Sequence, residues 1–146
     1  MDRFYPAKSK VKAKSKRTKE SKIERVDSLK NAPSRDYCEW ESVKCVGGIV
    51  VTVDHIDRHD KLIDIHVLPP TVEYIRFTSC SLRYKLHMRA LPRALNECNV
   101  STNRLFGSVG LRTLPEHLVN LDLSTNRLVG PVDLTELPRT LRNLSL

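Results

Sequence analysis

The stretch LPEHLVNLDLSTNRLVGPVDLTE, residues 114–136, decides the fold, because the units before it repeat its pattern of apolar residues. Leu-Pro pairs open successive units with a period of 23, at Leu68, Leu91, Leu114 and Leu137. Counted from each opening Leu, apolar residues recur at offsets 4, 7, 9, 14 and 18. In the quoted unit they are Leu118, Leu121, Leu123, Leu128 and Val132. Intervals of equal length with matching apolar positions indicate a repeat protein.

Each part of the unit has a physical reason. The Leu-x-Leu alternation predicts a short strand with both Leu side chains pointing inward. Offset 12 holds Cys80, Asn103 or Asn126, where a side-chain amide can bond backbone groups that a turn leaves unpaired. The Val-x-Leu segments at 109–111 and 132–134 predict a second extended stretch on the outer side. Because one unit cannot bury its own apolar face, the units are expected to stack into a solenoid with one continuous core.

These features resemble the leucine-rich repeat family, whose signature is L-x-x-L-x-L-x-x-N/C-x-L. The segment Cys38-Glu-Trp-Glu-Ser-Val-Lys-Cys45 resembles the plant-type N-terminal cap of that family, C-x-W-x-x-V-x-C. The 23-residue period and the Leu-Pro openings look closer to protist leucine-rich repeat proteins, such as those of trypanosomes. The resemblance covers about residues 36–146. It implies a parallel inner β-sheet, an extended or irregular outer side, few helices, and a bridged cysteine pair with Trp40 over the end of the solenoid.

The residues themselves leave the state of Cys38 and Cys45 open, and reduced thiols are the favoured alternative. The first 30 residues contain no apolar run typical of a secretory signal, so a cytoplasmic or nuclear location is expected. Cys80 and Cys98 fall on repeat positions that face the core and are expected to be structural. No apolar run of 18 or more residues occurs, so no membrane partner is expected.

The chain divides into a disordered basic tail, residues 1–34, and a repeat domain, residues 35–146. Residues 1–35 hold 12 Lys or Arg and 4 Asp or Glu, a net charge of +8, whereas residues 36–146 hold 13 of each. The domain comprises a cap at 36–45, a degenerate repeat at 45–67 with a strand at 49–53, full repeats at 68–90, 91–113 and 114–136, and a partial repeat at 137–146. The strand of that last repeat is expected to present an open edge, which another chain could pair with.

Side chains between the inward Leu residues are expected to form two columns on the concave face. By residue type, these positions suit a protein partner, and Tyr74 and Arg76 are the most anchor-like. The predicted protein-binding residues are Tyr74, Arg76, Glu97, Asn99, Asn120, Asp122 and Asn143. The alternative is a solvated face without a partner.

The basic tail has three interpretations. Residues 8–22, and in particular Lys14, Lys16, Arg17 and Lys19, could act as a nuclear-import segment, hold nucleic-acid phosphates, or be simply solvated. The loop at 54–60 gathers His and Asp residues, but Arg58 in its middle favours a charged solvent loop over a metal site.

No phosphate-binding loop, metalloprotease motif or activated nucleophile occurs, so neither an enzyme nor a cofactor is expected. The sequence therefore predicts a non-catalytic module that binds a protein partner on its concave face. The alternative is a component of a nucleoprotein assembly, anchored to nucleic acid by the tail. A receptor-like ectodomain, suggested by the cap, would need a secretory signal.

Overall fold

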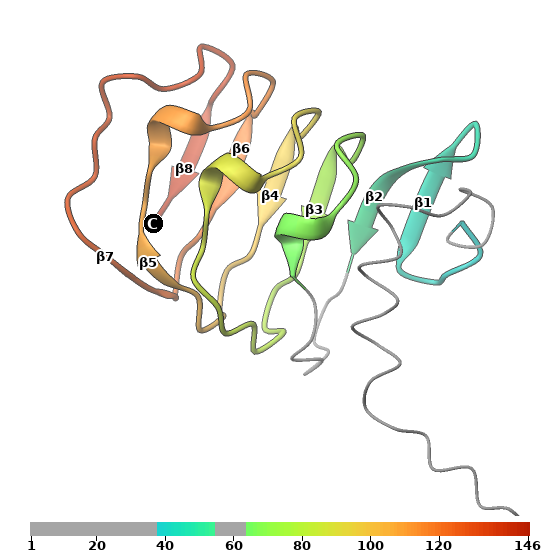
Figure 1. Cartoon of the computed structure of the whole chain (residues 1–146), viewed down its shortest axis with the longest axis horizontal. Helices are drawn as coiled ribbons and strands as arrows, with labels where there is room; N and C mark the ends of the chain where they lie inside the picture. Colours follow the sequence, from blue (N-terminus) through green and yellow to red (C-terminus); the bar gives the residue numbers. More distant parts are fainter. Residues whose placement is uncertain (1–37, 55–63) are drawn as a thin grey trace, which may run out of the picture.

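The computed structural model describes residues 38–54 and 64–146, which form a β-solenoid of about four turns (Figure 1). The strands are β1 (Val43–Val46), β2 (Ile49–Asp54), β3 (Tyr74–Arg76), β4 (Glu97–Asn99), β5 (Phe106–Ser108), β6 (Asn120–Asp122), β7 (Arg127–Val129) and β8 (Asn143–Ser145). Helical elements in the described ranges are the short 3-10 turns η2 (Ile65–Val67), η3 (Met88–Ala90) and η4 (Leu111–Thr113). None of the helices described is long and apolar enough to cross a membrane. The predicted tail, residues 1–34, lies outside the described residues, as do residues 55–63.

One six-stranded sheet runs the length of the solenoid in the order β1-β2-β3-β4-β6-β8 (Figure 1). The strands β2, β3, β4, β6 and β8 are parallel, and only β1 pairs antiparallel with β2. The predicted inner parallel sheet is therefore confirmed, as is the strand expected at 49–53. From β3 to β8 each Cα partner lies 23 residues further along, for example Ile75 with Cys98 and Cys98 with Leu121.

The repeat positions build a single apolar core. In the quoted unit Leu118 is fully buried, and Leu121 and Leu123 are 1% exposed. In the unit before it, Cys98, at the position of Leu121, is 1% exposed. Cys80 and Cys98 are buried and are not joined in a disulfide, which confirms their structural placement. One cluster joins all these buried residues from Val43 to Leu123. The successive turns of the solenoid, which we call coils, therefore share one interior as expected.

The asparagine at offset 12 closes the turn after each inner strand. The Asn103 amide nitrogen donates to the carbonyls of Phe77, Val100 and Ser101 at 2.6, 2.9 and 3.0 Å. Its oxygen accepts from the Leu82 amide at 3.0 Å, in the preceding coil. Asn126 repeats this pattern, whereas the shorter Cys80 donates to the Thr78 carbonyl at 3.3 Å. The side chain therefore links two coils as well as stabilising its own turn.

The outer side is extended or irregular with few helices, as expected, but its extended segments lie at other residues than predicted. The extended segments are β5 and β7, which lie before Val109 and Val132 rather than at 109–111 and 132–134. Leu111 instead begins a 3-10 turn that buries its side chain. Pro115 disfavours helical backbone at Leu114, so the turn ends at Thr113 and the chain returns to the inner sheet. A tight turn can carry an apolar residue inward where the chain changes direction, which an extended segment could not do.

The two ends of the solenoid are finished differently. At the first end, Trp40 is partly buried against the core beside the β1–β2 hairpin, and Cys38 and Cys45 form a disulfide. The favoured prediction of reduced thiols is therefore wrong for this pair. Their Cα atoms lie 5.5 Å apart, which is within bridging distance. At the other end, Leu134 and Leu146 are 59% and 50% exposed, and β8 pairs only with β6 among the described strands.

Candidate functional site

The parallel register places the predicted binding residues in two straight columns on the exposed face of the six-stranded sheet. One column is formed by the Cα partners Thr52, Tyr74, Glu97, Asn120 and Asn143. The other is formed by Asp54, Arg76, Asn99, Asp122 and Ser145. The buried residue of each strand lies between the columns and points the opposite way. We call this surface the sheet face.

Some of the predicted residues bind one another. The Arg76 guanidinium donates to Glu97 at 3.0 Å across neighbouring strands, and this bond raises the pKa of Arg76. The pair is partly open to solvent, since the side chains are 46% and 26% exposed. The Asn143 amide donates to the Asn120 oxygen at 2.7 Å. A partner that binds here must therefore fit over these two hydrogen-bonded pairs or replace their hydrogen bonds with its own.

Two predicted residues have a structural role as well. The Asn99 oxygen accepts from the Ser101 amide at 3.0 Å and from its hydroxyl at 2.7 Å. Asp122 does the same for Ser124, at 3.0 and 2.6 Å. These bonds hold the backbone where each strand ends, as Asn and Asp side chains commonly do. The spacing of Asn or Asp followed two residues later by Ser was the sequence signal for this role.

The remaining residues form a compact group near the middle of the sheet. Tyr74 and Arg76 come from β3, and Glu97 faces them from β4. Asp54, the Cα partner of Arg76, adds a carboxylate, and its Oδ1 is buried without a hydrogen-bond partner among the described residues. An aromatic ring beside a half-exposed ion pair offers both apolar and charged contacts. We call Tyr74, Arg76 and Glu97 the Tyr74 platform.

Other predicted sites fall outside the described residues. Lys14, Lys16, Arg17 and Lys19 belong to residues 1–37, and most of the 54–60 loop belongs to residues 55–63. Their assignments stay predictions.

A histidine cluster between neighbouring coils is a feature that sequence reasoning missed. His66 Nδ1 lies 2.6 Å from Asp64, and its Nε2 accepts the His87 backbone N–H at 3.0 Å. The ring also meets Tyr84 edge-on at 5.4 Å between centroids. Burial lowers the pKa of His66 below its ordinary value of 6.5, against the opposing effect of Asp64. Both nitrogens are therefore occupied when the ring is neutral.

Acid should destabilise the solenoid through His66. Because the pKa is lower in the folded state, the stabilising contribution is fully present above pH 6.5 and is lost as the pH falls below it. Protonation of His66 at Nε2 would place a second proton against the His87 N–H, so the hydrogen bond between them would be lost. The melting temperature should fall more for the native protein than for His66→Gln when both are moved from about pH 7.5 to about pH 5. Equal falls in the two proteins would exclude this role.

Comparisons with known proteins add little to this geometry. No family model matches the chain, and no curated protein matches it. A solved structure described as a plant ice-binding protein is similar over 73% of this chain, with a TM-score of 0.46 and 21% sequence identity. The matched region covers 46% of that protein, less than half its length. A likeness of this strength carries no argument about function.

Proposed function

We propose that the chain is a non-catalytic protein-interaction module of the leucine-rich repeat type, which binds a protein partner on the sheet face. Three features support the repeat type. Its coils are 23 residues long. The side chains of Asn103 and Asn126, at offset 12, bond to the preceding coil, and we call these two residues the Asn ladder. Trp40 and the Cys38–Cys45 bridge cap the first coil. The capping segment resembles the plant type, and the coil length and Leu-Pro openings look closer to those of the protist proteins.

The observation that carries the binding proposal is the Tyr74 platform. Tyr and Arg are enriched among the residues that contribute most to protein interfaces. Here they lie side by side on a rigid sheet, with Glu97 in contact, so little ordering is needed before a partner binds. The strands are about 4.8 Å apart, so five of them span roughly 20 Å, a length that suits a peptide or a small epitope.

The test compares capture of partners from the protein's own cells by three tagged versions of the full chain. The double variant Tyr74→Ala/Arg76→Glu changes two side chains that make none of the turn-stabilising bonds described above. The matched control, Arg139→Glu, reverses an exposed charge away from the sheet face. A specific partner should be retained by the native chain and the control, and its recovery should fall at least about tenfold with the double variant. Identical recovery by all three would place the partner site elsewhere.

The location of the protein stays a prediction. The expectation of a cytoplasmic or nuclear setting assumed reduced cysteines, and the bridge between Cys38 and Cys45 removes that support. Disulfides persist chiefly in oxidising compartments, which favours the receptor-like alternative over the nuclear one.

A further inference from the structure

Residues 36–146 hold equal numbers of basic and acidic residues, but these charges are unevenly distributed over the surface. Acidic residues of the sheet face include Asp54, Glu97 and Asp122. By contrast, no Asp or Glu occurs at 74–96, at 98–115 or at 123–132. Apart from β3 and the end of β4, these stretches supply the returning part of each coil, on the side of β5 and β7. The net charge of the domain therefore hides a cationic surface.

The cationic side chains are brought together by the pairing of the coils on that side. Lys85 is the Cα partner of Phe106, and Phe106 is the Cα partner of Arg127. All three side chains are exposed and form a row across three coils. Arg83 and Arg104 are exposed as well and lie two residues before Lys85 and Phe106. We call Arg83, Lys85, Arg104, Phe106 and Arg127 the outer basic face.

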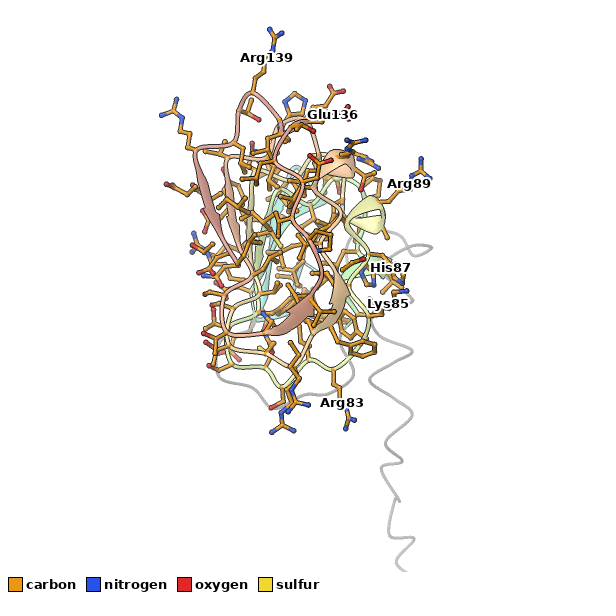
Figure 2. The ribbon with its side chains drawn as sticks, turned by 90° about the vertical axis from the view of Figure 1, so that its left-hand side faces the viewer. Arg83, Lys85, His87, Arg89, Glu136 and Arg139 are labelled. Carbon is orange, nitrogen blue, oxygen red and sulfur yellow. A yellow bond between two sulfur atoms is a disulfide. The ribbon has the colours of Figure 1, made fainter. Side chains whose placement is uncertain are left out.

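Figure 2 shows where this surface lies. Arg83 projects from the bottom of the view and Lys85 from its right-hand side, away from the sheet, and His87 and Arg89 follow above Lys85 on the same side. The spacing of two residues keeps each of these side chains pointing outward, while Leu86 and Met88 between them are buried and Tyr84 is partly buried.

The cations of this surface have no carboxylate partner among residues 38–54 and 64–146. Arg76 and Arg112 do have such partners: Arg76 pairs with Glu97, and Arg112 lies 2.6 Å from Asp133. Unneutralised guanidinium groups close together create a positive potential that attracts a polyanion. Arg also offers bidentate hydrogen bonds to phosphate and stacks on flat rings.

Phe106 points to the kind of polyanion. Its side chain is 45% exposed, between Lys85 and Arg127 in the row. A single exposed aromatic residue is ordinary, but an aromatic residue flanked by cations is the arrangement on which single-stranded nucleic acids bind. The cations hold phosphates, and the ring stacks on a base. A duplex keeps its bases stacked within itself and could not use the ring.

We propose that the outer basic face binds single-stranded nucleic acid, with one base on Phe106 and phosphates at Arg83, Lys85, Arg104 and Arg127. This site is distinct from the Tyr74 platform and needs no residue of the basic tail. The +8 charge of residues 1–35 would add to its affinity without sequence preference.

The test measures binding of a fluorescein-labelled poly(dT) oligonucleotide to the full chain by anisotropy, over a range of salt concentrations. Phe106→Ala should weaken binding about fivefold or more and leave the salt dependence unchanged. Arg104→Glu/Arg127→Glu should weaken binding and lower the slope of log K against log salt by about 1.4, or about 0.7 for each phosphate contact. The matched control, Arg139→Glu/Arg142→Glu, changes the net charge equally at exposed positions elsewhere and should bind much more tightly than the Arg104 variant.

Several outcomes would overturn the proposal. Equal binding by the native chain and Phe106→Ala would exclude a base stacked on Phe106. Equal losses of affinity in both charge-reversal variants would show that binding depends only on the net charge of the protein. An unlabelled duplex that competes as well as unlabelled poly(dT) would contradict the single-strand preference. If Phe106→Ala weakened binding to heparin but not to the oligonucleotide, the ligand would be an anionic polysaccharide. Should the Glu variant fail to fold, Arg104→Gln/Arg127→Gln must still lower the salt slope.

Discussion

Replacing Asn103 with Ala should lower the free energy of unfolding by about 3 kcal/mol, since buried polar groups left without partners cost about 1–3 kcal/mol each. The residue is 8% exposed and makes four side-chain hydrogen bonds. Without them, the Leu82 N–H and the Phe77 carbonyl each lose a hydrogen bond inside the protein, whereas the Val100 carbonyl keeps its bond from Asn126. Chemical denaturation monitored by circular dichroism would measure the change.

Two matched variants make this prediction specific. Asn126→Ala removes the same bonds one coil later, where the side chain is only partly buried, so its effect should be smaller. Asn103→Cys places at this position the residue that occurs naturally as Cys80, which retains one weak donor. It should be less harmful than Asn103→Ala. If all three variants unfolded at the same denaturant concentration as the native protein, the Asn ladder would not stabilise the stack.

Leu121→Ala should cost about 3–4 kcal/mol, the usual range for deletion of a fully buried Leu side chain that leaves a cavity. Leu121 is 1% exposed in β6, between Cys98 of β4 and Leu144 of β8. The loss should appear in one cooperative unfolding transition, because the coils share one core. Thermal and chemical denaturation should agree on its size.

Leu144→Ala is the matched control. Leu144 occupies the same repeat position in β8, but it is only partly buried because no described strand covers it. Its substitution should cost about 1 kcal/mol, in line with the apolar area that it removes from water. Similar losses for Leu121 and Leu144 would mean that β8 is covered or that Leu121 is not enclosed.

The inner half of each coil could be predicted from the sequence because three independent constraints agree there. The alternation of Leu residues fixes which side chains point inward, Asn103 and Asn126 fix the turn, and the Leu-Pro openings fix the repeat length. The register of the strands follows from these constraints, so both columns of the sheet face were placed correctly. The pattern could not show that Asn99 and Asp122 also hold the turns, although the Ser two residues after each was a usable signal.

The outer half could not be predicted in the same way. There, Cα partners such as Phe106 and Arg127 lie 21 residues apart rather than 23. A shift of two residues leaves every side chain pointing to the same side, so the apolar pattern fits both registers equally well. The row of Lys85, Phe106 and Arg127 depends on the shifted register and could therefore not be predicted from the repeat pattern. The absence of acidic residues from 74–96 and 98–115 was the only signal of that surface in the sequence.

The bridge between Cys38 and Cys45 was undecided for another reason. Whether two nearby cysteines are joined depends on the compartment as well as on their spacing, and the spacing alone does not identify the compartment.

Residue-resolved amide hydrogen exchange tests most directly whether the 23-residue coils stack on one shared interior, on which both proposed surfaces depend. The Val100 amide donates to the backbone carbonyl of Asp122 in the following coil at 2.9 Å, and the Phe106 amide donates to the backbone carbonyl of Tyr84 in the preceding coil at 3.1 Å. Neither bond exists within a single coil, so both amides should exchange slowly and together, at the rate set by global unfolding. Rapid exchange at Val100 and Phe106 in the folded protein would show that the coils are not stacked in this way and would contradict both binding surfaces.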